Sequence, residues 1–207
     1  MNEHNILAAI LAGGKSKRMG KDKLFINLNK KPIVQYTTDK LKKHFKKIII
    51  VTNKNNIFFK KNNIITVKDC IGGQLGPLVG ILTAMDWAKQ NLPKTKWVAT
   101  FPCDTPFFPE SLIKKFIKES KKKDSLLLCA SSHGRKHNIF GLWSLDLYDK
   151  LKDDLINKKV RKVQDWTDKN KIKNLEFTFK DYDPFFNINT EEDLEFAKEL
   201  SKKIKNE

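Results

Sequence analysis

Residues 11–24 read Leu11-Ala12-Gly13-Gly14-Lys15-Ser16-Lys17-Arg18-Met19-Gly20-Lys21-Asp22-Lys23-Leu24, and they follow directly on an apolar run from Ile6 to Leu11. The apolar run predicts a buried strand, and the small residues after it predict a loop. Because glycine has no Cβ, a phosphate group can come close to the backbone N–H groups of such a loop. The pattern therefore predicts a strand followed by a loop that binds an anionic ligand, most simply a phosphate.

Two well-known glycine-rich loops do not fit this pattern. The Walker A loop requires a glycine at position 9, where this sequence has Ala9. The dinucleotide-binding fingerprint requires Gly-x-Gly spacing, which Gly13-Gly14-Lys15 lacks. Neither of these two families fits the loop, and a tight turn with solvated lysines is the alternative to a phosphate-binding loop.

Three motifs carry a resemblance to a known family. Residues 11–23 contain Leu-Ala-Gly-Gly-x-Ser-x-Arg-Met-Gly-x-Asp-Lys, which resembles the signature loop of nucleotidyltransferases that move a nucleoside monophosphate onto a phosphorylated acceptor. Residues 102–107, Pro-Cys-Asp-Thr-Pro-Phe, are similar to the metal-binding turn of these enzymes, and residues 187–194 to their Asn-x-Asn-Thr-x-Glu-Asp-Leu ending. Within the superfamily the chain is most similar to the molybdenum cofactor guanylyltransferases of the MobA type. The resemblance runs from about Ile6 to Leu194.

The order of the elements predicts an α/β fold. Strands are expected at Asn5–Leu11, Ile48–Val51, Ile64–Val67 and Trp97–Phe101, with helices beginning near Pro32, Pro77 and Pro109. Strands that are apolar at nearly every position are buried on both faces, which favours a parallel sheet covered by helices. The resemblance implies the same arrangement: a three-layer αβα, Rossmann-like (GT-A-like) nucleotidyltransferase fold with a mostly parallel, open sheet.

The second half of the chain is less regular. We expect strands at Ser125–Ser131, Ile139–Trp143 and Leu175–Phe179, and helices at Leu145–Ile156 and Val160–Thr167. A polar segment, residues 132–138, is expected to separate the first two of these strands. Thr190 and Asp193 have the spacing of a capping box, so the last helix should begin there.

Length and composition favour one cytoplasmic domain. A chain of 207 residues with 40% apolar residues suits a single domain, residues 1–207, and no stretch is apolar for long enough to span a bilayer. No signal peptide is expected, because Glu3 stands where a basic region would be required. Cys70, Cys103 and Cys129 are far apart and lack metal-ligand spacing, so we expect reduced thiols.

The formal net charge of +17 raises the alternative of a nucleic-acid-binding protein. Only three residues, Arg18, Arg135 and Arg161, are arginines, whereas recognition of base edges and phosphates favours arginine. The lysines occur along every segment, as in residues 40–47, and are interpreted as solvated helix faces. A nucleic-acid partner is therefore not expected, although the charge would attract an anionic substrate.

The candidate site follows from the predicted sheet. In open α/β sheets the ligand lies beyond the carboxyl ends of the strands. This rule brings together residues 11–23, Asn53, Asp69 with the Gly76-Pro77 turn, and Asp104. Asp104 lies between Pro102 and Pro106, which restrict the backbone, and one or two carboxylates suffice to hold a Mg²⁺ ion that is bound to a triphosphate.

The resemblance adds roles for individual residues. It implies nucleotide binding by Leu11, Ala12, Gly13, Gly14, Lys23, Asn53, Asp69 and Asp104, Mg²⁺ binding by Asp104, and phosphate neutralisation by Arg18 and Lys23. Asn187 and Asn189 are further candidates for the metal or the acceptor, and a cap or turn role explains part of that run equally well. One position departs from the family, which usually has a proline where this sequence has Asn138. The acceptor side is therefore less well defined than the nucleotide side.

The resulting hypothesis is Mg²⁺-dependent transfer of GMP from GTP to the phosphate of molybdopterin, or of Mo-molybdopterin, with molybdoenzymes or their chaperones as further partners. Because the acceptor phosphate is already anionic, no protein nucleophile is required. A cytidylyl or sugar-phosphate nucleotidyltransferase would carry the same loop. A nucleic-acid-binding module and a non-catalytic nucleotide sensor remain as alternatives from other functional classes.

Overall fold

The computed structural model of the chain describes residues 5–13, 25–54, 57–73, 76–122 and 124–204. Its strands are β1 (Ile6–Leu11), β2 (Asn27–Leu28), β3 (Lys31–Pro32), β4 (Ile48–Val51), β5 (Ile65–Val67), β6 (Trp97–Pro102), β7 (Leu127–Ser132), β8 (Arg135–Ser144) and β9 (Lys173–Phe177). Its helices are α1 (Ile33–Lys42), α2 (Ile57–Lys61), α3 (Pro77–Asn91), α4 (Glu110–Glu119), η2 (Leu145–Leu147, a 3₁₀ turn), α5 (Tyr148–Ile156), α6 (Val163–Lys169) and α7 (Glu191–Ile204).

Seven strands form one sheet in the order β5-β4-β1-β6-β8-β7-β9. The first four of these strands are parallel to one another, and β8 runs antiparallel to both β6 and β7. Every residue of the central strand β1 is buried, as expected for a strand that is covered on both faces. The expectation of a mostly parallel, open sheet is confirmed.

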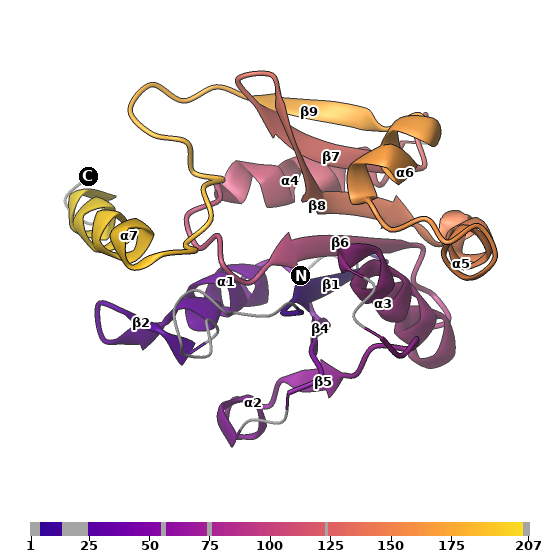
Figure 1. Ribbon diagram of the computed structural model, residues 1–207, viewed down its shortest axis with the longest axis horizontal. Coiled ribbons are helices and arrows are strands. Elements are labelled where there is room, and N and C mark those ends of the chain that lie inside the picture. The colour runs from indigo at the N-terminus through magenta and orange to yellow at the C-terminus, as the bar shows by residue number, and fades with distance from the viewer. Residues whose placement is uncertain (1–4, 14–24, 55–56, 74–75, 123, 205–207) are drawn as a thin grey trace.

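Helices cover both faces of the sheet and give three layers (Figure 1). Alternate residues of β1 point to opposite faces, as strand geometry requires: Ile6, Ala8 and Ile10 lie in one core and Leu7, Ala9 and Leu11 in the other. The first core is filled from α1 and α4, and the second from α3, α5 and α6. The predicted αβα layering is confirmed.

The polar segment predicted between two strands of the second half is largely strand. His133 (φ 47°) and Gly134 (φ 75°) form a two-residue turn. Ser132 and Arg135, on either side of this turn, pair with each other. Strand β8 therefore begins at Arg135, four residues earlier than Ile139, where it was expected to begin. The sequence concealed this because the first residues of β8 are polar and only partly buried, so they show no apolar run.

Other element boundaries differ by a few residues. Helix α6 begins at Val163 instead of Val160, and β9 ends at Phe177 instead of Phe179. The hairpin β2–β3 and the short helix α2 were not predicted. Figure 1 shows α7 beside this hairpin, where Ile188 and Ala197 pack on Leu28 and Ile33. None of the helices described is long and apolar enough to cross a membrane.

Candidate functional site

The loops that carry the predicted site leave the same edge of the sheet. Two backbone bonds tie the end of β1 to its neighbours: the N–H of Ala12 donates to the carbonyl of Val51 (2.9 Å), and the N–H of Cys103 to that of Leu11 (3.3 Å). Leu11 and Ala12 are buried at this edge, and the exposed Gly13 follows. The carboxyl ends of β4, β1 and β6 therefore lie side by side, as the sheet rule predicts.

Helix α3 packs very closely on the end of β1. A Cβ added to Gly80 would stand 3.4 Å from Cδ2 of Leu11, which is van der Waals contact, so the backbone of α3 lies directly against the Leu11 side chain. Pro77 is the first residue of α3 and follows Gly76, which has a φ of 86°. The prediction that a helix begins at Pro77 is confirmed, and its N-terminal end lies near the strand ends.

Asn53 and Asp69 contact each other directly. The Nδ2 group of Asn53 donates to Oδ2 of Asp69 at 2.7 Å, and the backbone N–H of Asp69 donates to Oδ1 of Asn53 at 3.1 Å. The two residues follow the neighbouring strands β4 and β5; Asn53 is exposed and Asp69 is half-buried. This reciprocal pair leaves polar atoms of both side chains accessible to a ligand and fixes their orientation.

Asp104 lies in a turn directly after β6 and is partly exposed. The C-terminal segment returns to this turn: the N–H of Ile188 donates to the carbonyl of Asp104 at 2.9 Å. The hydroxyl of the buried Thr105 donates to Oδ1 of Asn187 at 2.7 Å and lies 3.3 Å from Oδ1 of Asp104. Asn187 and Ile188 are thus the residues of the C-terminal motif that bond to the Asp104 turn.

Asn189 has a different surrounding. Its backbone N–H donates to Oδ2 of Asp193 (2.7 Å), as does that of Thr190 (2.9 Å), and the N–H of Asp193 donates to the Thr190 hydroxyl (3.1 Å). These bonds confirm the predicted capping box at the start of α7. They also place Asn189 beside the helix cap, whereas Asn187 faces the turn after β6.

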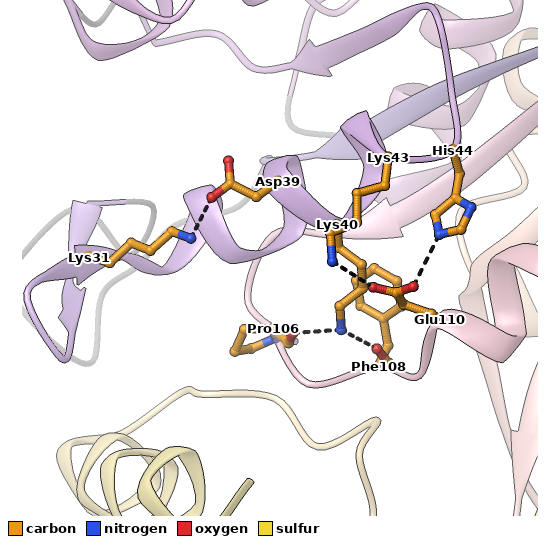
Figure 2. Close-up of polar contacts among 8 residues, drawn as sticks. All are labelled: Lys31, Asp39, Lys40, Lys43, His44, Pro106, Phe108 and Glu110. Carbon is orange, nitrogen blue, oxygen red and sulfur yellow. Dashed lines mark hydrogen bonds and ion pairs between the residues drawn. The ribbon is translucent and has the colours of Figure 1, made fainter. Parts of the chain in front are cut away.

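The turn after β6 is held on its other side by Lys40 from α1 (Figure 2). The Lys40 ammonium donates to the carbonyls of Pro106 (3.3 Å) and Phe108, and its Nζ lies 4.3 Å from the centre of the Phe108 ring. Burial lowers the pKa of Lys40 to about 8, against the opposing effect of Glu110. The expectation that residues 40–47 form a solvated face is therefore wrong for Lys40.

A cavity of about 180 Å³ opens beside the Asp104 turn. Its lining is formed mainly by the first half of β8 and by the C-terminal segment: Pro102, Arg135, Lys136, His137, Asn138, Ile139, Phe140, Phe185 and Asn187. Arg135 lines this cavity, the ammonium of Lys136 is paired with Asp168 at 2.6 Å, and Asn187 connects the cavity with Thr105 and Asp104. An anionic ligand would fit its charge.

A small polar network supports the cavity wall. The Ser132 hydroxyl lies 2.7 Å from Nε2 of His137 and donates to Asp183 at 3.1 Å, while the His137 ring stacks on Phe185 at 4.7 Å. Burial lowers the pKa of His137, against the opposing effect of the Asp183 carboxylate. A neutral imidazole at neutral pH follows. Sequence reasoning did not identify this network, because its members come from three separate segments.

The donor set at Asp104 fits Mg²⁺ bound together with a nucleotide. Within the ranges that the structure describes, no three His, Cys, Asp or Glu side chains group as a metal cage. Mg²⁺ needs no such cage when phosphate oxygens and water fill most of its coordination sphere. The partly exposed carboxylate of Asp104, at a turn fixed from two sides, meets this requirement.

Three predicted site residues, Gly14, Arg18 and Lys23, lie outside the described residues. The expectation of reduced thiols is confirmed for Cys70, Cys103 and Cys129, and burial raises the pKa of Cys129 to about 12.

Residues 8–171 of the chain match the MobA-like NTP transferase domain family. A molybdenum cofactor guanylyltransferase from Rhizobium rhizogenes is 32% identical over 190 residues, which cover 89% of this chain and 87% of that relative. A molybdenum cofactor guanylyltransferase from Yersinia pestis (strain Pestoides F) is 35% identical over 192 residues, 92% of this chain and 94% of that relative.

Solved structures show the same fold at lower identity. The molybdopterin-guanine dinucleotide biosynthesis protein A of Archaeoglobus fulgidus has a TM-score of 0.74 at 21% identity, covering 95% of this chain and 99% of that chain. The 4-diphosphocytidyl-2C-methyl-D-erythritol synthase of Anaerococcus prevotii has a TM-score of 0.70 at 18% identity, covering 95% of this chain and 96% of that chain. Fold similarity alone does not distinguish a guanylyl from a cytidylyl transferase.

Proposed function

This chain belongs to the MobA-like NTP transferase domain family, and we propose that it is a molybdenum cofactor guanylyltransferase that transfers GMP from GTP to the phosphate of molybdopterin or Mo-molybdopterin. The observation that carries the proposal is the similarity to guanylyltransferases, 32–35% identical over about nine tenths of the chain. We further propose that residues 1–207 form one catalytic domain that works in the cytoplasm. Molybdoenzymes or their chaperones would receive the product.

The nucleotide would bind at the carboxyl ends of β1, β4 and β5. Residues Leu11 to Gly14 would offer backbone N–H groups to the phosphates. Asn53 and Asp69, already joined by two hydrogen bonds, would contact the base or the ribose of GTP through their remaining polar atoms. Arg18 and Lys23 would neutralise phosphate charge as it moves toward the leaving group.

The reaction requires alignment and neutralisation of charge rather than a protein nucleophile. A phosphate oxygen of the acceptor forms a bond to the α-phosphorus of GTP while the bond to the bridging β-phosphate oxygen breaks, and pyrophosphate leaves with that electron pair. Asp104 would hold Mg²⁺, which supplies neutralisation of the phosphate oxygens when bound. The Thr105–Asn187 contact keeps this turn in a fixed place.

The acceptor would enter from the cavity beside the turn. Arg135 would give the cavity a positive charge suited to a phosphorylated molecule, whereas the charge of Lys136 is paired with Asp168, and Asn187 joins the cavity to the Asp104 turn. This position would put the acceptor phosphate on the side of Asp104 that is away from Asn53 and Asp69, since β4 and β5 lie on the far side of β1 from β6.

The first test is a thermal-shift panel of GTP, CTP, UTP and ATP, each with Mg²⁺. Only the nucleotide that binds the folded state should raise the melting temperature, so a rise with GTP alone is expected. The second test measures pyrophosphate release from GTP with molybdopterin as the acceptor. Asp104→Ala should lose metal-dependent turnover while it retains the fold, because Asp104 is partly exposed.

The outcomes separate the alternatives. A shift with CTP in place of GTP would identify a cytidylyltransferase. GTP binding without pyrophosphate release would identify a nucleotide sensor. Guanylyl transfer by Asp104→Ala at the wild-type rate would remove Asp104 from the site. Duplex or RNA binding that falls steeply with salt and that nucleotides do not displace would favour a nucleic-acid-binding protein.

A further inference from the structure

The turn that carries Asp104 is fixed by contacts that the chemistry itself does not use. On one side the C-terminal segment contributes Asn187 and Ile188 to the turn, and the Phe107 ring stacks on Phe186 at 5.8 Å. On the other side stands one side chain, Lys40 of α1. Figure 2 shows its ammonium between Pro106 and Phe108, two and four residues after Asp104.

The geometry of Lys40 is that of a brace between α1 and this turn. One ammonium donates to two backbone carbonyls and stands over the ring of Phe108. Bonds from a charged donor are stronger than neutral ones, and they gain strength where water is excluded. Phe108 is fully buried and packs on Phe101 of β6 (5.3 Å) and Phe140 of β8 (5.2 Å). Lys40 thus fixes the turn to the core as well as to α1.

Nearby charges do not replace Lys40 in this role. Figure 2 shows Glu110 in contact with Lys43 (3.1 Å) and with His44 (3.2 Å). The Lys43 side chain is 65% exposed, whereas burial is the largest influence on the pKa of Lys40. Lys40, in the last turn of α1, and Lys43, the residue that follows the helix, therefore have different surroundings, which provides a matched control.

We propose that Lys40 is a positioning residue for the metal-binding carboxylate of Asp104, acting through the carbonyls of Pro106 and Phe108. The inference rests on the proposed function, because it takes Asp104 as the Mg²⁺ ligand. Lys40 does not contact the substrate. It sets the distance between the turn after β6 and the loops that follow β1, β4 and β5. Loss of the brace weakens metal binding with nucleotide while the nucleotide loops themselves stay intact.

The test compares Lys40→Met, Lys40→Arg and Lys43→Met with the wild type. Mn²⁺ binding in the presence of GTP is followed by electron paramagnetic resonance, with Asp104→Ala as the reference for a lost site. GTP binding without metal is measured by calorimetry. Lys40→Met should bind Mn²⁺ at least tenfold more weakly with GTP affinity unchanged, Lys40→Arg should stay within about threefold of the wild type, and Lys43→Met should match it.

Several results would overturn the inference. Mn²⁺ binding by Lys40→Met within twofold of the wild type would do so, and so would equal losses in Lys40→Met and Lys43→Met. If Lys40→Met is too unstable, Lys40→Gln is measured well below its melting temperature, with the same tenfold criterion. A wild-type protein whose Mn²⁺ binding is the same as that of Asp104→Ala would instead refute the metal site of the proposed function, and the Lys40 inference with it.

Discussion

Replacement of Asp154 by asparagine should destabilise the protein by a predictable, pH-dependent amount. Asp154 lies in α5 with its side chain only 7% exposed. It accepts hydrogen bonds from Lys150 (2.9 Å), Lys158 (2.7 Å) and the indole N–H of Trp166 (2.8 Å). These contacts join α5 to α6, whose Trp166 packs on Trp143 of β8.

The magnitude follows from the pKa of this carboxyl group. Burial alone would raise the pKa of Asp154, but the hydrogen bonds from Lys158, Lys150 and Trp166 outweigh it and lower the pKa from 3.8 to about 2. A shift of this size corresponds to about 2.5 kcal/mol at about 1.36 kcal/mol per unit. Because both lysines are about half exposed and partly screened by solvent, we expect a loss of about 2 kcal/mol at neutral pH.

The contribution of Asp154 to stability should fall as the pH is lowered. A depressed pKa contributes stability above about 3.8, the value in the unfolded chain, and this contribution disappears as the pH falls through about 2. Roughly half of the difference between wild type and Asp154→Asn should remain at pH 3. At pH 7 the melting temperature should fall by about 4–8 °C for a chain of this length.

The assay is urea denaturation of both proteins at pH 7 and pH 3, with Asp153→Asn as the control. Asp153 lies on the same helix and also pairs with Lys158, but its side chain is 46% exposed, so its removal should change stability little. Equal losses in the two variants, or an Asp154→Asn deficit that is unchanged at pH 3, would refute the reasoning.

Two further predictions concern the site and the sheet beside it. Asn53→Ala and Asp69→Ala should each weaken GTP binding. Because the two residues are hydrogen-bonded to each other, the double variant should lose less binding free energy than the sum of the two single losses, by about 0.5–1.5 kcal/mol. Binding free energies that are simply additive in calorimetry would contradict a coupled pair. Gly141→Ala should lower the free energy of unfolding, measured by urea denaturation, by about 1–3 kcal/mol. The new Cβ would stand 2.5 Å from Nε1 of Trp143, which donates to the Thr100 hydroxyl at 2.9 Å. A loss below about 0.5 kcal/mol would show that the indole can move without cost.

The convergence of the residues proposed to bind the nucleotide could be predicted from the sequence, because these residues follow buried strands. Apolar runs identify β1, β4 and β6, and the carboxyl ends of parallel strands share one edge. Asn53 and Asp69, 16 positions apart in the sequence, therefore lie within hydrogen-bonding distance as the sheet rule requires. The capping box at Thr190 was predictable for a different reason, since it depends on local spacing alone.

The parts that were missed depend on contacts between distant segments. Lys40 was counted with a solvated lysine run, although it lies seven positions after Ile33 and three after Thr37, on the buried face of α1. That spacing was a usable signal, but the charge of the run concealed it. The polar network in the wall of the cavity could not be predicted from the sequence. Ser132 and His137 are brought together by the turn at Gly134, and Asp183 reaches them only because the C-terminal segment returns to this place.

The contact between Thr105 and Asn187 has a consequence for the protein as it is being made. The two residues are 82 positions apart, which a ribosome working at about 5–20 residues per second covers in roughly 4–16 s. During that interval the growing chain already contains the four parallel strands and the nucleotide loops, while the turn after β6 lacks its last partner. The order of synthesis thus delays the completed packing of the Asp104 turn until the segment around Asn187 has emerged.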